Sequence, residues 1–136
     1  MRRACSLPSA IAAVTIALAA APAMGAAAFE RHAYVWADQP AAAAYVPNPL
    51  YAAQSVGTGI RISRTAVGAY QVRFLGFHAG AAPGGTVQVT AYNTSDHCNT
   101  ASWIASGNDL LVNVRCWRTR DQTPVDRSYT VMVVFR

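Results

Sequence analysis

The sequence contains no lysine and only six acidic residues, so its positively charged side chains at neutral pH are eleven arginines. Nine of these arginines and all six acids follow residue 28, which gives the segment 29–136 a net charge near +3. Proteins that bind nucleic acid present a much denser basic face, and we therefore expect no nucleic-acid partner. An arginine-only complement is also typical of a GC-rich genome, so by itself it indicates no ligand.

The chain also lacks the residue spacings of known catalytic and metal sites. No serine stands in a G-x-S-x-G turn, and none of the three histidines has a His, Cys or Asp partner at metal-ligand spacing on one strand. The six acids are scattered, whereas glycoside hydrolysis needs two that converge across a cleft. We therefore expect no metal, no cofactor and no catalytic residue, which is to say a protein that is not an enzyme.

A long apolar run stands near the N-terminus. Two arginines follow Met1, residues 10–21 are uncharged and apolar, and small residues in A-x-A patterns occupy 21–23 and 26–28. This order is typical of a secretory signal peptide, and the run is shorter than the ~20 residues of a membrane-spanning helix. We expect a signal peptide at 1–28, cleaved between about 21 and 28. The domain 29–136 would then be secreted and extracellular, with no membrane attachment after cleavage.

Cysteine is scarce. Cys5 precedes the apolar run, which leaves Cys98 and Cys116 in the expected mature domain. An even pair in an exported chain indicates one disulfide.

No segment after residue 28 shows helical periodicity, whereas alternation of apolar and polar residues recurs about every ten residues. The expected strands number seven or eight and are separated by turn residues. They lie at 33–37, 51–55, 60–64, 70–74, 86–92, in the two arms of a hairpin over 98–117, and at 129–135. This pattern predicts an all-β, antiparallel two-sheet sandwich with one disulfide; a small barrel is the alternative. The last strand is apolar on both faces, which favours a central place in its sheet.

The register of both hairpins can be predicted. In the first, Ile62 opposite Val72 directs the apolar residues inward and sets Arg61 opposite Arg73 on the solvent side. In the second, the expected pairs are Ile104 with Leu110, Trp103 with Leu111, Ser102 with Val112, Thr100 with Val114, and Cys98 with Cys116. Direct cross-strand neighbours are close enough for a disulfide, so the hairpin and the cysteine pair support each other.

A series of short motifs spans nearly the whole segment after residue 28. They are A-Y-V-W-A-D-x-P at 33–40, Y-x-P at 45–47, R-x-x-x-G-x-Y-x-V-x-F-x-G at 64–76, G-G-x-V-Q-V-T-A-Y at 84–92, Cys98, Trp103, V-x-V-x-C at 112–116 and V-D at 125–126. In these motifs the chain resembles a family of small secreted β-rich proteins from GC-rich bacteria that have no assigned activity. The resemblance implies export and a β-rich module, and it implies no substrate, cofactor or catalytic residue.

Aromatic residues gather in the first third of the expected domain, where Tyr34, Trp36, Tyr45 and Tyr51 lie. Tyr34 and Trp36 are two residues apart and share one face of a strand. We favour the interpretation that this face fills the core. The alternative is a carbohydrate-binding module in which Tyr34, Trp36 and Tyr51 are exposed and stack on sugar rings.

Arginine supplies a second candidate site. Like charges directly opposite each other destabilise a hairpin, so Arg61 and Arg73 suggest a site for an anionic surface polymer, which arginine binds through its planar fork. The interpretation we favour is that both are solvated beside aspartates of other strands.

The sequence thus predicts a secreted, non-catalytic β-sandwich that acts as a surface-binding or extracellular interaction module, with a cell-wall or polysaccharide surface as its partner. A carbohydrate-binding module is one alternative. A small secreted hydrolase or a protease inhibitor is another, and the loops at 79–85 and 118–124 are where an inhibitor would carry its binding loop.

Overall fold

The computed structural model describes residues 30–78 and 84–135. The expected signal peptide and most of the loop at 79–85 therefore lie outside the described residues. Within them the chain forms nine strands and one 3-10 turn: β1 (Arg31–Ala37), β2 (Ala44–Tyr45), η1 (Pro49–Tyr51), β3 (Ala52–Gln54), β4 (Gly59–Ala66), β5 (Ala69–Leu75), β6 (Gly85–Ala91), β7 (His97–Ser106), β8 (Asp109–Trp117) and β9 (Tyr129–Phe135). In this part of the chain, no helix has the length and apolar character that crossing a bilayer requires.

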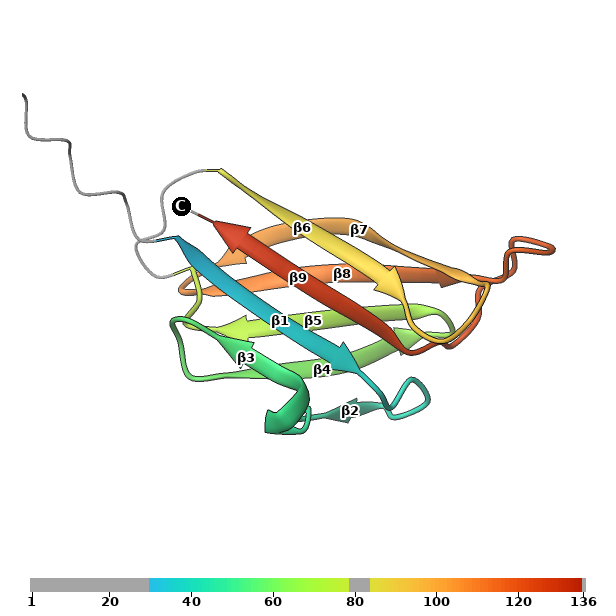
Figure 1. Ribbon diagram of the computed structural model, residues 1–136, viewed down its shortest axis with the longest axis horizontal. Helices are drawn as coiled ribbons and strands as arrows, with labels where there is room; N and C mark the ends of the chain where they lie inside the picture. Colours follow the sequence, from blue (N-terminus) through green and yellow to red (C-terminus); the bar gives the residue numbers. More distant parts are fainter. Residues whose placement is uncertain (1–29, 79–83, 136) are drawn as a thin grey trace, which may run out of the picture.

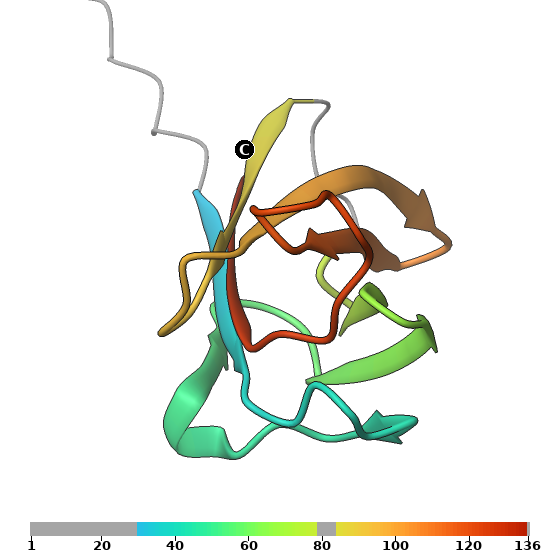
Figure 2. The same ribbon diagram turned by 90° about the vertical axis from the view of Figure 1, so that its right-hand side faces the viewer.

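The strands form two antiparallel sheets packed face to face, as Figures 1 and 2 show. One sheet has the order β3-β1-β9-β6 and the other the order β2-β4-β5-β8-β7. The predicted all-β sandwich is confirmed. The strand count exceeds the expected seven or eight because the two-residue strand β2 pairs with β4.

The core between the sheets is built from the inward residues of both. Its largest fully buried side chains include Phe74, Phe77, Leu110 and Tyr129. The β4–β5 hairpin has the predicted register, with Ile62 opposite Val72 and Arg61 opposite Arg73. Ile60 and Ile62 of β4 and Val72 and Phe74 of β5 are buried in the core. A one-residue slip would turn Arg61 and Arg73 toward the core.

The β7–β8 hairpin matches the prediction in only its first half. Cys98 lies opposite Cys116 and the two form a disulfide. The register then shifts between Thr100 and Ser102, so that Ser102 pairs with Asn113 instead of Val112. The predicted pairs beyond this point are therefore wrong: Trp103 lies opposite Val112, Ile104 opposite Leu111 and Ala105 opposite Leu110. A β-bulge places one extra residue on β7, an edge strand, and regular alternation cannot reveal it.

Strand β9 occupies the predicted central position, paired with β1 on one side and with β6 on the other. Its inward residues Val131 and Val133 are buried, whereas Thr130 and Met132 on the other face are exposed. The second apolar face of β9 is thus part of the molecular surface.

Strand β1 overturns the favoured interpretation of its aromatic residues. Ala33, Val35 and Ala37 face the core, each at most 2% exposed. Tyr34 points outward and is 47% exposed, and Trp36, on the same side, is half-buried. The interpretation that Tyr34 and Trp36 fill the core is therefore wrong. Small side chains suffice on β1, because large residues of other strands, such as Phe74 and Tyr129, fill the core.

Candidate functional site

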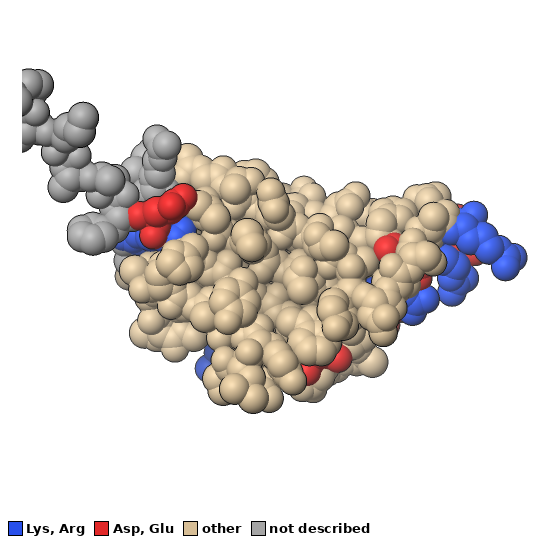
Figure 3. Space-filling model, in the orientation of Figure 1, with Lys and Arg blue, Asp and Glu red and all other residues tan. Residues whose placement is uncertain are grey.

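The outer surface of the sheet β3-β1-β9-β6 carries a continuous set of uncharged side chains. Tyr34 of β1 lies opposite Met132 of β9, which lies opposite Gln88 of β6. In the next row, Trp36 lies opposite Thr130, which lies opposite Thr90. Figure 3 shows the middle of this surface without charged atoms, which gather at its rim.

The strands themselves explain this absence of charge. Arg31 is the only arginine or acid in β1, β3, β6 and β9. It lies at the start of β1 on the inward side, and its Nη1 donates a hydrogen bond to the carbonyl oxygen of Phe77 (2.9 Å). The central part of the surface therefore offers aromatic rings, hydroxyls and amides.

Three aromatic rings meet at the end of β1. The ring of Trp36 lies between those of Tyr51 and Tyr92, with a centroid distance of 4.7 Å to each. Both pairs are edge-on or tilted, the arrangement that aromatic quadrupoles favour. We call Tyr34, Trp36, Tyr51, Tyr92 and Met132 the aromatic face.

Local structure fixes the two tyrosines that flank Trp36. Tyr51 ends the 3-10 turn η1, whose first residue follows Asn48; the Oδ1 atom of Asn48 accepts a hydrogen bond from the Leu50 amide (2.9 Å). Tyr92 follows β6, and its amide donates to the carbonyl of Ser128 (2.8 Å). Residues from three separate segments are thereby held around one indole.

A depression of about 540 Å³ adjoins this cluster. Trp36 and Tyr92 form one wall, and Asn93, Thr94 and Ser128 add amide and hydroxyl groups. Asp126 and Arg127 also line it, but each is held by an ion pair: Asp126 with Arg64 (2.9 Å) and Arg127 with Asp96 (2.6 Å). The hydrogen bond from Arg64 is the main cause that holds the pKa of Asp126 below its ordinary value.

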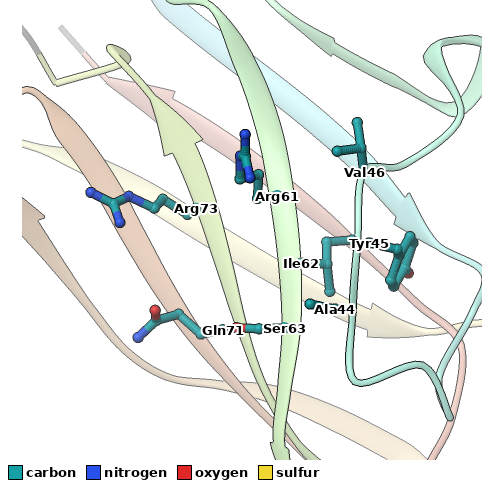
Figure 4. Close-up of a pocket in the computed structure, with 8 residues that line it drawn as sticks. All are labelled: Ala44, Tyr45, Val46, Arg61, Ile62, Ser63, Gln71 and Arg73. Atoms are coloured by element: carbon teal, nitrogen blue, oxygen red, sulfur yellow. The ribbon is translucent and has the colours of Figure 1, made fainter.

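The outer surface of the other sheet carries the two predicted arginines. A groove of about 360 Å³ runs between the β2 segment and strands β4 and β5, and Arg61, Ser63, Gln71 and Arg73 line it (Figure 4). Arg73 is turned toward β8, where its Nε lies 2.7 Å from Oδ2 of Asp109. The favoured interpretation, an arginine beside an aspartate of another strand, therefore fits Arg73.

Arg61 differs from Arg73 although the two lie side by side. It is exposed, and no acid in the described parts of the chain forms an ion pair with it.

The two sets of predicted binding residues lie on opposite faces of the sandwich (Figures 1 and 2). The aromatic set, Tyr34, Trp36 and Tyr51, belongs to one sheet layer, and the arginine pair, Arg61 and Arg73, belongs to the other.

Tyr92 and Met132 were not among the residues predicted for a binding site. The signal for Tyr92 was present, since the alternation that directs Val87 and Val89 inward directs Thr90 outward and, two residues on, Tyr92. Met132 carries no such signal, because β9 is apolar on both faces and only the topology shows which face is covered.

In residues 30–78 and 84–135, no group of three His, Cys, Asp or Glu side chains is placed to hold a metal ion. Comparison of the chain with models of protein families, with curated proteins and with solved structures gives no match.

Proposed function

We propose that this protein is a secreted, non-catalytic β-sandwich that binds a neutral polysaccharide through its aromatic face. The observation that carries the proposal is the uncharged outer surface around Tyr34 and Trp36, with Tyr51 and Tyr92 packed against Trp36. Export is supported by the apolar N-terminal run and by the disulfide between Cys98 and Cys116.

Sugar rings fit such a surface for a physical reason. The C–H bonds on one side of a pyranose ring are slightly positive, and the face of an aromatic ring is negative. The hydroxyl groups at the edge of the sugar need hydrogen-bond partners once water is displaced. Asn93, Thr94 and Ser128 supply such groups beside Trp36. An uncharged surface favours a neutral polysaccharide over a charged one.

The ion pairs in the depression support binding without catalysis. A general acid needs a pKa near the working pH, whereas Arg64 keeps the pKa of Asp126 low. Asp126 is therefore an ionised structural group at neutral pH.

A retention experiment tests the proposal. Residues 29–136 are mixed with insoluble cellulose, chitin and β-1,3-glucan, and the bound fraction is measured for the wild type, Tyr34→Ala and Trp36→Ala. We expect the wild type to be retained on at least one polymer, and each variant to bind about tenfold more weakly, the loss that follows from about 1.4 kcal/mol of contact energy.

Trp103→Ala is the matched control, since Trp103 is as exposed (46%) as Tyr34 (47%) and lies on the other sheet. It should bind like the wild type. Tyr34 contacts none of the three clustered rings in a ring pair, so Tyr34→Ala tests the face even where Trp36→Ala disturbs folding. Failure of the wild type to bind any of the three polymers, or equal losses in Tyr34→Ala and Trp103→Ala, would overturn the proposal.

A further inference from the structure

The groove on the sheet β2-β4-β5-β8-β7 contains two arginines side by side, an arrangement that does not stabilise the fold. Arg61 and Arg73 are direct cross-strand neighbours, and like charges in such a pair destabilise a hairpin. Asp109 neutralises the charge of one of the two, Arg73. Asp109 binds the Nε atom of Arg73 (2.7 Å) and, through its other oxygen, the amide of Gly76 (2.7 Å).

Both carboxylate oxygens of Asp109 are occupied by these two hydrogen bonds. The Gly76 amide, followed by Arg73, holds the pKa of Asp109 below its ordinary value, so the carboxylate stays ionised at neutral pH. Asp109 therefore fixes Arg73 in place and leaves the charge of Arg61 uncompensated.

The other groups at the groove add donors and no negative charge. Gln71 donates to Asn113 (3.2 Å), which donates to Ser102 (3.0 Å), so a row of amides crosses the sheet beside the arginines. Ser63 lies opposite Gln71 in the same row. Burial raises the pKa of Tyr45 to about 12, so its phenol remains neutral.

We propose that this groove is a second binding site, in which Arg61 binds a carboxylate or phosphate group carried by a polymer. The guanidinium makes two parallel hydrogen bonds to such a group. The hydroxyl of Ser63, two residues along β4 on the same face, is the neighbouring donor. The site is on the opposite face from the aromatic face and does not depend on the proposed function.

This assignment gives Arg61 an unusual energetic signature. Replacing an arginine that stabilises the fold lowers the stability of the protein. Arg61 instead lies opposite Arg73, so replacing it removes a repulsion between like charges. We expect Arg61→Gln to raise the melting temperature of the free protein at low salt and to weaken anion binding. A gain of stability with a loss of binding is what a residue kept for function shows.

The test measures the dissociation constants of residues 29–136 for polygalacturonate, which carries carboxylates, and for polyphosphate, at low ionic strength. Arg61→Gln should bind the preferred polymer about tenfold more weakly, as expected for the loss of one bidentate charged contact. The polymer that the wild type prefers identifies the ligand group. Arg120→Gln is the matched control because Arg120 is exposed in the loop after β8 and its loss removes the same charge; it should change binding less than twofold.

Equal weakening by Arg61→Gln and Arg120→Gln would show that only net charge matters and would overturn the proposal, as would the absence of wild-type binding to either polymer. Tyr34→Ala should leave polyanion binding unchanged, and Arg61→Gln should leave retention on neutral polysaccharide unchanged. The two proposals can therefore fail separately.

Discussion

At the scale of single residues, Asp126 connects parts of the sandwich that are far apart in the sequence. Its carboxylate accepts hydrogen bonds from Arg64 Nε (3.0 Å), the Gly68 amide (2.8 Å) and the Tyr70 hydroxyl (3.0 Å). Arg64 and Tyr70 belong to β4 and β5, whereas Asp126 lies in the segment between β8 and β9. The carboxylate thereby fixes that segment against the first hairpin.

We predict that Asp126→Asn lowers the free energy of unfolding at neutral pH by about 1–2 kcal/mol, less than the full value of charged hydrogen bonds because solvent screens part of the interaction. The pKa of Asp126 is lower in the folded protein. Its stabilising effect is therefore present above the unfolded pKa of about 3.9 and is lost as the pH falls through the folded value. Urea unfolding at pH 7 and pH 3 should show a smaller acid-induced loss in the variant than in the wild type.

Asp121→Asn is the control for this prediction. Within the described residues, Asp121 pairs only with groups of its own loop, Arg118 and Thr123. Its replacement should therefore have the smaller effect at pH 7. Equal stability of Asp126→Asn and the wild type at that pH would contradict the structural role of Asp126.

The inward face of strand β1 could not be predicted from the sequence. The segment 33–37 alternates Ala, Tyr, Val, Trp and Ala, so both faces of the strand are apolar and alternation cannot choose the inward one. The choice depends on the volume that other strands leave between the sheets. Arg61 and Arg73 posed no such difficulty, because a charged face and an apolar face can be told apart from the sequence.

At the scale of elements, the turn between β4 and β5 depends on Gly68. Its φ is +65°, and a Cβ atom there would lie 2.5 Å from the carbonyl oxygen of Cys116 and 2.8 Å from the amide nitrogen of Val125. The Gly68 carbonyl also accepts a hydrogen bond from the Cys116 amide (2.8 Å). The first hairpin can approach the disulfide-bonded strand β8 this closely because residue 68 has no side chain.

We predict that Gly68→Ala destabilises the protein by about 2–4 kcal/mol, since the left-handed conformation and the steric clash both oppose the methyl group. Gly107 in the β7–β8 turn provides the comparison. Its φ is +60°, but no atom lies within 4 Å of the position of a Cβ, so Gly107→Ala should cost only about 1 kcal/mol. Urea unfolding of the two variants measures the difference, and equal losses would show that the contact at Gly68 is unimportant.

The hairpins also show which elements could be predicted. Both hairpins, the disulfide and the register of β4 with β5 follow from alternation together with the cysteine spacing. The pairing of β7 beyond Thr100 does not follow, because the sequence gives no sign of the bulge. The residues from Ala101 to Ser106 are all uncharged and all exposed, so no charged or buried position fixes their register.

At the scale of the whole molecule, the two sheets give the sandwich two chemically different outer surfaces. One is aromatic and has no charged side chain in its middle, and the other carries Arg61 and Arg73 together with Asp109 of β8. Our two proposals assign a neutral polysaccharide to the first surface and an anionic polymer to the second.

The proposed binding of sugar at the aromatic face can be tested in one titration, because the three tryptophans of the chain lie in different places. Trp36 belongs to the aromatic face, Trp103 to the edge strand β7, and Trp117 stacks on His97 at the end of β8. In a ¹⁵N-labelled sample of residues 29–136, each indole N–H gives its own NMR signal. On addition of soluble oligosaccharides of cellulose, chitin and β-1,3-glucan, we predict that the Trp36 signal shifts in a saturable manner with at least one of them while those of Trp103 and Trp117 stay in place. A saturable shift of Trp103 or Trp117 with Trp36 unchanged, or no shift with any of the three sugars, would contradict sugar binding at the aromatic face.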